Sequence, residues 1–369
     1  MLERLTWAEI SLKDYTYNLS QIKKLIGSKV KLMAVVKANA YGHGIVEIGK
    51  TAEEWGVDFI GVVCLYEGRL LREAGVKLPI LILNYIDPLG VRGALDLGLT
   101  VNVMDEEVLG SLDKYARKVG KKAKIHVKID SGMHRAGLMP EDAVRFIPHI
   151  ENYKNILLEG IFTHFATSDE KDLGFTMEQL KRFSSVLHKL KLPKDIIIHA
   201  ANSGATLRLP QTYFNMVRPG IISYGLAPSN YFKIPFKRRP VLTLKTKIVQ
   251  TRKIGKGETV GYGRKYTAGK ETVVGLLPVG YGDGIRRGPN NSGLVMVRGK
   301  EAKILGRVSM DQISIDLTGI KNIRVGDEVI LISNDSVSNI SAEKVAERWG
   351  TINYELVTSL SSRISRIYF

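Results

Sequence analysis

The sequence of 369 residues contains a single cysteine, Cys64. One cysteine cannot form an internal disulfide or a cysteine cluster for a metal ion. Long apolar runs are also lacking, and none reaches the roughly 20 residues that span a bilayer as a helix. The first residues, MLERLTWAEISLKDY, carry acids and no apolar core, so we expect no signal peptide. These absences favour a cytoplasmic protein without a membrane partner.

Acidic residues are in the minority, because 37 Asp and Glu stand against 54 Lys and Arg, a net charge of +17. A basic chain raises the alternative of a nucleic-acid-binding protein. The longest basic cluster is only Lys237–Arg239, however, and no stripe interleaves Lys or Arg with aromatics. We therefore expect a solvated basic surface that attracts an anionic cofactor or substrate, and no nucleic-acid partner.

Short apolar, β-branched runs alternate with stretches of helical periodicity over the first 220 residues. Near-continuous apolar runs are typical of strands buried on both faces of a parallel sheet. Eight such strands in this length predict an α/β fold, a (β/α)8 TIM barrel, with a doubly wound open sheet as the alternative. We expect the strands at residues 32–37, 59–63, 80–83, 100–103, 124–129, 157–163, 196–200 and 214–218.

Helices are expected at residues 12–26, 45–55, 105–119 and 176–190. The rhythm changes after Gly225, where residues 226–240 form a linker containing Pro, Lys and Arg. The remainder is rich in β-branched runs separated by glycine turns, with one helix in SAEKVAERWG closed by Gly350. We therefore divide the chain into a barrel, residues 1–232, and a mostly-β C-terminal domain, residues 233–369.

Lys37 ends the first apolar run and opens a loop rich in Gly and Asn. Barrel enzymes carry catalytic residues at the C-terminal ends of their strands. A lysine there is partly desolvated, which lowers its pKa and favours use as an amine nucleophile that forms a Schiff base. On its own, the position also suits a structural lysine that extends its ammonium to solvent.

Polar residues follow several other predicted strands. The fifth strand leads into Lys128 and Arg135, the sixth ends at His164, and the last two lead into Asn202-Ser203-Gly204 and Arg218-Pro-Gly220-Ile221. Any one of these residues could be structural, but their convergence at one barrel face indicates a catalytic site. The segments after the last two strands occupy the place where barrels often bind phosphate.

The stretch VVKANAYGHG resembles the cofactor-lysine signature of the alanine racemases, which are barrel-type pyridoxal-phosphate enzymes. The resemblance continues through KIDSGMHRAG, THFATSD, HAANSGA, MVRPGI, VGYGRKYTA, VGYGDGIRR, GRVSMDQ and NYELVTSLSSRISRIYF, and so covers essentially the whole chain. The barrel motifs alone leave a related barrel-type decarboxylase as an alternative, whereas the C-terminal motifs narrow the resemblance to the alanine racemases. The resemblance implies a homodimer with shared active sites.

The resemblance also implies roles for individual residues. Lys37 holds pyridoxal phosphate and acts as one of two bases; Tyr266 of the partner subunit is the other. Residues that bind the cofactor phosphate are Tyr41, Ser203, Gly220, Ile221 and Tyr354, with Asn202 close by. Residues around the rest of the cofactor and the substrate are Arg218 at the pyridine nitrogen, Arg135 at the phenolic oxygen, His164 between Tyr266 and Arg218, Met310 and Asp311 at the substrate carboxylate, and Tyr281 and Arg287 at the entrance.

Two bases on opposite faces suit a racemase, because one removes the α-proton and the other returns it. Lys128 is a candidate for carbamylation, as in many members of the family. The aspartates and histidines form no convincing metal cluster, so we expect no required metal. We interpret the chain as an alanine racemase supplying D-alanine for peptidoglycan, with a serine or broad-spectrum racemase of the same fold as the alternative.

Overall fold

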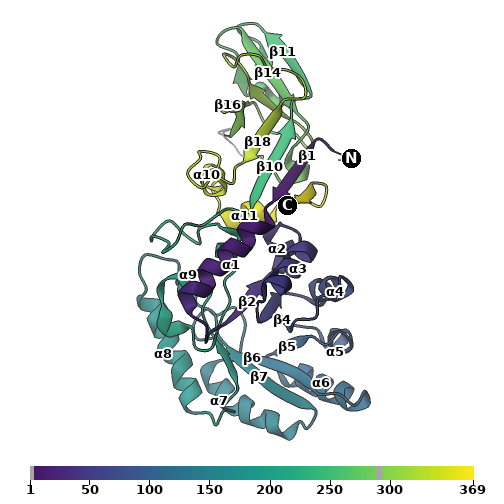
Figure 1. Ribbon diagram of the computed structural model, residues 1–369, viewed down its shortest axis with the longest axis vertical. Coiled ribbons are helices and arrows are strands. Elements are labelled where there is room, and N and C mark those ends of the chain that lie inside the picture. Colours follow the sequence, from purple (N-terminus) through teal and green to yellow (C-terminus); the bar gives the residue numbers. More distant parts are fainter. Residues whose placement is uncertain (1–3, 288–292) are drawn as a thin grey trace.

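The computed structural model describes residues 4–287 and 293–369. These residues form an α/β barrel and a mostly-β domain, stacked along the long axis of the molecule (Figure 1). The predicted fold class is therefore confirmed. The parallel strands of the closed barrel are β2 (Lys31–Val35), β3 (Phe59–Val62), β4 (Ile80–Ile82), β5 (Thr100–Val103), β6 (Ala123–Lys128), β7 (Ile156–Phe162), β8 (Ile197–His199) and β9 (Met216–Val217).

Helices surround the barrel and lie close to their predicted ranges. The first, α1, begins after Ser11, whose hydroxyl accepts the Asp14 amide, and it buries Leu19 and Ile22 at helical spacing. Asp105 caps α6 in the same way through the Val108 amide. The helices of the barrel are α1 (Leu12–Ile26), α2 (Lys37–Tyr41), α3 (Ile45–Trp55), α4 (Leu65–Glu73), α5 (Val91–Asp96), α6 (Glu106–Lys118), α7 (Pro140–His149), α8 (Gly174–His188) and α9 (Ser203–Arg208).

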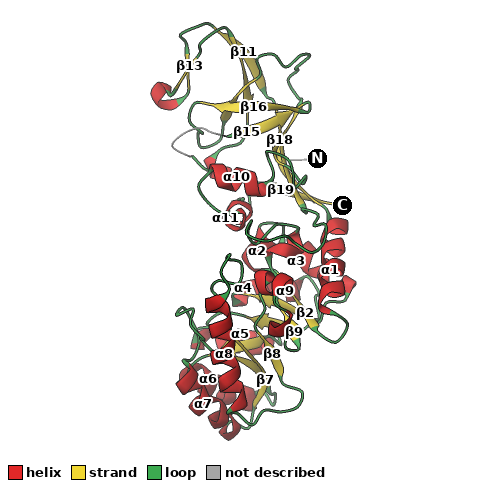
Figure 2. Cartoon of the chain, turned by 90° about the vertical axis from the view of Figure 1, so that its left-hand side faces the viewer, coloured by secondary structure: helices red, strands yellow, loops and turns green. Residues whose placement is uncertain are grey.

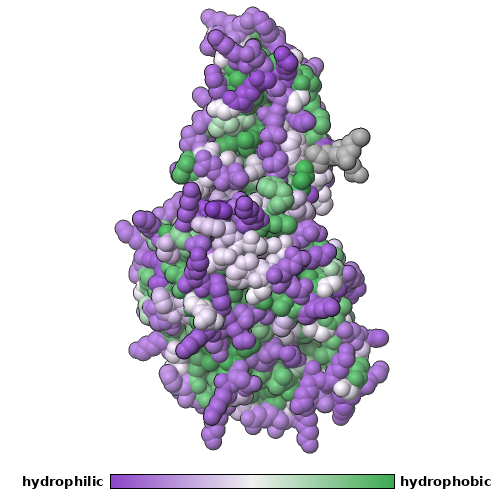
Figure 3. All heavy atoms as spheres, in the orientation of Figure 1, coloured by the Kyte–Doolittle hydropathy of each residue, from purple (hydrophilic) through white to green (hydrophobic). Residues whose placement is uncertain are grey.

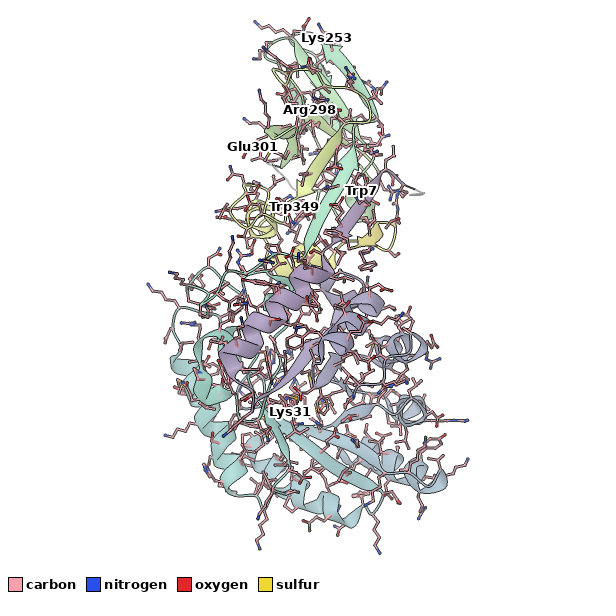
Figure 4. All side chains as sticks on the ribbon, in the orientation of Figure 1. Trp7, Lys31, Lys253, Arg298, Glu301 and Trp349 are labelled. Atoms are coloured by element: carbon pink, nitrogen blue, oxygen red, sulfur yellow. The ribbon has the colours of Figure 1, made fainter. Side chains whose placement is uncertain are left out.

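The segments that follow the C-terminal ends of the barrel strands meet residues 354, 355 and 358 of the second domain around one cavity. Figure 4 labels Lys31, at the start of β2, within the barrel. The C-terminal end of β2 differs from the prediction. The strand predicted at 32–37 ends at Val35, and Lys37 is instead the first residue of the short helical turn α2.

The C-terminal domain is built on a nine-stranded sheet in the order β11-β14-β17-β16-β15-β18-β10-β1-β19. Its strand β1 comes from the N-terminus and pairs with β10 antiparallel and with β19 parallel. The sheet strands are β1 (Thr6–Ile10), β10 (Leu242–Lys247), β11 (Gln250–Ile254), β14 (Thr272–Leu277), β15 (Leu294–Val297), β16 (Lys300–Leu305), β17 (Ile313–Asp316), β18 (Glu328–Ile332) and β19 (Ser365–Tyr368). The division at residues 232/233 stays a prediction, to which the structure adds this return of residues 6–10 to the second domain.

Two smaller groups complete the second domain. Strands β12 (Thr259–Val260) and β13 (Tyr266–Thr267) form a separate hairpin, which Figure 2 shows at the end far from the barrel. Helix α10 (Ala342–Arg348) is capped by the Ser341 hydroxyl, in line with the predicted helix. Helix α11 (Asn353–Thr358) lies at the junction of the two domains and packs against α2 (Figure 1).

Hydrophilic residues cover much of the face shown in Figure 3, with hydrophobic ones scattered between them. Across residues 4–287 and 293–369, no helix combines the length and the apolar character needed to cross a membrane.

Candidate active site

A cavity of about 610 Å³ opens at the C-terminal ends of the barrel strands. Its walls come from the segments that follow the strands and, on one side, from α11 of the second domain. Most of the sequence-predicted site residues line it. They are Lys37, Tyr41, Lys128, Arg135, His164, Asn202, Ser203, Arg218, Gly220 and Tyr354.

Lys37 projects from an unusual backbone turn. The next four residues, 38–41, all have positive φ between 52° and 54°, so α2 is a turn of left-handed helix built from non-glycine residues. This conformation is disfavoured for L-residues and persists only where the surroundings hold it. Burial, together with the nearby Arg135 cation, lowers the pKa of the Lys37 amine. The lowered pKa increases the neutral fraction of the amine, the form that attacks an aldehyde or accepts a proton.

Arg218 is buried at the centre of a polar chain. Its guanidinium donates to the Thr163 carbonyl at 2.8 Å and bonds His199 Nδ1 at 2.9 Å and His164 Nδ1 at 3.3 Å. Among the residues that the structure describes, the hydrogen-bond partners of Arg218 are histidine nitrogens and backbone carbonyls, with no carboxylate. Burial lowers the pKa of Arg218 to about 9, which leaves it a cation at neutral pH. The site thus presents a fixed positive charge without a neutralising acid.

The polar chain continues through the barrel core. His199 Nε2 bonds His126 Nδ1 at 2.8 Å, and His126 Nε2 lies 3.4 Å from the Glu159 carboxylate. Burial lowers the pKa of both imidazoles, so both are neutral at pH 7. Because Arg218 can only donate, it fixes the tautomer of His199 with the proton on Nε2.

Lys128 and Arg135 lie on the side of the cavity formed by β6 and its loop. Asp130 shapes this loop, because its carboxylate accepts the amides of Gly132, His134 and Arg135 at 2.9 to 3.0 Å. Burial and the neighbouring Arg135 cation lower the pKa of Lys128 to about 8.

Tyr41, Ser203 and Gly220 meet in another part of the cavity wall. Ser203 Oγ accepts the Gly220 amide at 2.9 Å. A Cβ on Gly220 would lie 2.2 Å from Tyr41 Oη, so only glycine allows the tyrosine this approach. The Tyr41 and Tyr354 rings lie 6.2 Å apart between centroids. Ile221 is fully buried behind this wall and does not line the cavity.

The remaining predicted residues lie on the second domain, outside the cavity of their own chain. Tyr266 is on β13, in the distant hairpin, while Met310 and Tyr281 are 54% and 42% exposed. Asp311 pairs with Arg363 at 2.6 Å, and Arg287 is exposed. One chain therefore supplies a lysine-centred half of the predicted site and leaves these residues on another surface.

Sequence reasoning missed Glu67 and His126. Glu67 is buried beside Lys37 and bonds backbone amides at the ends of β2 and β3, and His126 links His199 toward Glu159. Neither residue occurs in a motif at the end of a strand. The sequence of α4 is also of mixed polarity, so it does not indicate that Glu67 is buried. Within the described part of the chain, no group of three or more His, Cys, Asp or Glu side chains is placed to hold a metal ion.

A closed barrel with a basic, lysine-containing mouth and a β-rich second domain defines an enzyme of the (β/α)8 class. Two family models match the chain: alanine racemase, N-terminal domain, over residues 10–228, and alanine racemase, C-terminal domain, over residues 241–368. The chain belongs to the alanine racemase family, a family of isomerases.

Individual relatives agree with the family models over full length. An alanine racemase of Halothermothrix orenii is 43% identical over 369 residues, covering 100% of this chain and 97% of the relative. One of Methanococcus maripaludis is 40% identical and covers 100% of both chains. Among solved structures, alanine racemase of Clostridium difficile 630 has a TM-score of 0.96 at 38% identity, with coverage of 100% and 97%. That of Bacillus anthracis with bound L-Ala-P has a TM-score of 0.93 at 37% identity, with coverage of 100% and 96%.

Proposed function

We propose that this chain interconverts L-alanine and D-alanine with pyridoxal phosphate as its cofactor. The observation that carries the proposal is the shared cavity of Lys37, an amine with a lowered pKa, and Arg218, a cation with no carboxylate partner in the described residues. The choice of alanine as the substrate rests on the relatives, which are named alanine racemase. A cytoplasmic location and the supply of D-alanine for peptidoglycan belong to the same proposal and rest on the family resemblance.

The donors around the cavity fit pyridoxal phosphate. Four cationic side chains, Lys37, Lys128, Arg135 and Arg218, outnumber two carboxylates in the lining, which suits a phosphorylated anion. In the proposal, Lys37 binds the aldehyde, Arg218 faces the pyridine nitrogen and Arg135 the phenolic oxygen. The residues proposed for the phosphate are Tyr41, Ser203, Gly220, Ile221 and Tyr354, with Asn202 near it.

When bound, the cofactor supplies an electron sink for the negative charge left on Cα. An arginine at the pyridine nitrogen would not transfer its proton to that nitrogen near neutral pH, because the pKa of Arg218 stays well above 7. We infer that Arg218 would leave that nitrogen unprotonated, which would weaken the electron sink and limit side reactions such as transamination.

Proton transfer at Cα is assigned to two bases. Lys37 Nζ takes or returns the proton on one face, and Tyr266 of the partner subunit does so on the other. A lysine amine has an ordinary pKa of about 10.4, so its pKa must be lowered for it to act as a base at neutral pH. For Lys37 the lowering follows from burial and Arg135.

A homodimer is part of the proposal because Tyr266, the proposed second base, does not line the cavity of its own chain. Tyr266 of the same chain lies on the distant hairpin. We propose that Tyr266, Met310, Asp311 and Tyr281 of the second domain complete the cavity of the partner subunit. Arg287 would line the entrance with Tyr281.

Lys128 is proposed to carry a carbamate that orients Arg135. The support is its pKa of about 8, which leaves a neutral amine fraction able to react with carbon dioxide. An unmodified ammonium that contacts an anion is the alternative.

The decisive experiment incubates the purified protein with pyridoxal phosphate and L-alanine and measures D-alanine. Borohydride reduction should attach the cofactor to Lys37, detected by peptide mass, and Lys37→Ala should lose both label and activity. Racemisation of serine and other amino acids under the same conditions distinguishes a broad-spectrum enzyme. Cofactor attached to another lysine would refute the role of Lys37.

The second base is tested by isotope loss from each enantiomer. In Tyr266→Phe, we expect the loss of α-deuterium to solvent to slow much more from L-alanine than from D-alanine, since Lys37 remains on the other face. Overall racemisation should fall in both directions, because it needs both bases. Equal slowing of exchange from both enantiomers would count against the two-base assignment.

A further inference from the structure

The turn that carries Lys37 needs an external support. Residues 38–41 are left-handed, and the turn's own hydrogen bonds, such as Ala40 N to Val36 O at 2.7 Å and Gly42 N to Ala38 O at 3.0 Å, exist only once that conformation is imposed. A chain of L-residues prefers the right-handed alternative. Contacts from outside the turn must therefore decide which hand it takes, and with it where the Lys37 side chain points.

Glu67 on α4 supplies such a contact. Its side chain is only 8% exposed, and its Oε1 accepts the Ala38 amide at 2.6 Å while Oε2 accepts the Val63 amide at 2.8 Å. Ala38 directly follows Lys37, and Val63 directly follows β3. The last backbone bond between these neighbouring segments runs from Val36 N to Gly61 O at 2.9 Å. The carboxylate thus joins the two segments beyond the point where the sheet ends.

Helix capping explains only half of this geometry. Glu67 is the third residue of α4, where a glutamate commonly reaches back to a backbone amide before the helix. The bond from Val63 to Oε2 is close to that pattern, because Val63 directly precedes the N-cap residue Cys64. The bond from Ala38 to Oε1 does not fit that pattern, because it comes from a different strand and lies beside the lysine. Charge-assisted bonds of this kind are stronger than neutral ones, so Glu67 can oppose the strain of the turn.

We propose that Glu67 is a positioning residue whose carboxylate holds the left-handed turn at residues 37–41 and thereby fixes the Lys37 amine in the cavity. This inference rests on the proposed role of Lys37 as the cofactor lysine. It assigns Glu67 no contact with substrate or cofactor.

The test substitutes Glu67→Gln, which keeps the size of the side chain but replaces one acceptor with a donor. Glu53→Gln is the matched control, because the Glu53 carboxylate also bonds two backbone amides, those of Lys77 and Leu78 at 2.7 and 2.9 Å, outside the cavity. Hydrogen exchange of residues 36–44 is measured on the cofactor-free protein. We expect exchange there to rise on the order of tenfold in Glu67→Gln, the scale of one lost charged hydrogen bond, and to stay unchanged in the control.

Attachment of the cofactor gives the second measurement. The pyridoxal phosphate concentration that half-labels Lys37, trapped with borohydride, should rise about tenfold in Glu67→Gln and stay unchanged in Glu53→Gln. If wild-type Lys37 is never labelled, the proposed function fails. If the wild type is labelled and Glu67→Gln behaves like it in both measurements, only the positioning role is overturned.

Ala38→Gly distinguishes support of the turn from support of the fold. The Ala38 side chain is exposed, so its removal costs little packing, and glycine adopts positive φ freely. Added to Glu67→Gln, it should restore part of the lost labelling and protection. Added to Glu53→Gln, it should not restore the protection of the Lys77 and Leu78 amides, because the glycine relieves only the lysine turn. Should Glu67→Gln fail to fold, the double variant is expected to fold, and its failure to do so would overturn the proposal.

Discussion

Gly42 ends the left-handed turn where the barrel meets the second domain, and Gly42→Ala tests that contact. Gly42 has φ of 80°, and a Cβ there would lie 1.9 Å from the Val357 carbonyl oxygen of α11. Gly56 is the control. It also ends a helix, α3, with left-handed backbone at φ of 95°, but a Cβ there would meet nothing within 4 Å.

The two substitutions share one cost and differ in the other. Alanine in the left-handed region costs roughly 1–2 kcal/mol, and both variants incur it. Only Gly42→Ala adds a collision with rigid backbone, and overpacking of this kind typically costs about 1–3 kcal/mol. We therefore expect the free energy of unfolding to fall by about 1–2 kcal/mol in Gly56→Ala and by about 2–5 kcal/mol in Gly42→Ala.

Urea unfolding of the cofactor-free protein measures the difference from the midpoints, provided that the slope m is the same for both variants. Relief of the collision requires α11 or the turn to shift, and Tyr354 lies on α11. Cofactor affinity should therefore fall in Gly42→Ala and not in Gly56→Ala. Equal destabilisation of the two variants would refute the argument that α11 braces the lysine turn.

Three further predictions concern other parts of the site. Gly220→Ala places a Cβ 2.2 Å from Tyr41 Oη, so cofactor affinity measured by fluorescence titration should fall. Unchanged affinity would contradict the assignment of Tyr41 and Gly220 to the phosphate site. Because the pKa of Lys128 is about 8, ¹³C-labelled bicarbonate should give a carbamate NMR signal that disappears in Lys128→Ala, and a signal that persists would belong to another lysine. Burial raises the pKa of Glu159, but contacts from His126 and Lys124 outweigh burial and lower that pKa to about 2. The ionised carboxylate therefore stabilises the fold at pH values above the ordinary carboxyl pKa, and this stabilisation is lost as the pH falls toward 2. The free energy of unfolding of Glu159→Gln should depend less on pH between about 4.5 and 2 than that of the wild type. An equally steep pH dependence would contradict the assignment.

Local periodicity explains how much of the fold could be predicted. The helix at 45–55 and the strand at 59–63 each contain enough apolar residues at one period to indicate their type without their partners. Because catalytic groups of a barrel follow its strands, the order of strands also indicated that Lys37, His164 and Arg218 share one face. The motifs then identified the family.

Long-range contacts explain what could not be predicted. Strand β1 has five residues and no distinctive pattern, and its place in the second domain depends on β10 and β19, which lie more than two hundred residues away along the chain. The position of Tyr266 outside its own chain's cavity likewise depends on how the domains stack.

The sequence by itself determined the barrel, the second domain, the family and the lysine, because each is encoded in local patterns or motifs. Only the tertiary structure decided the left-handed turn at residues 38–41 and its bond from Ala38 to Glu67. In ANAY only Asn39 adopts positive φ with any ease, since none of these residues is glycine. The hand of the turn is imposed by groups brought to it from α4 and α11, and such groups meet only when the chain is folded.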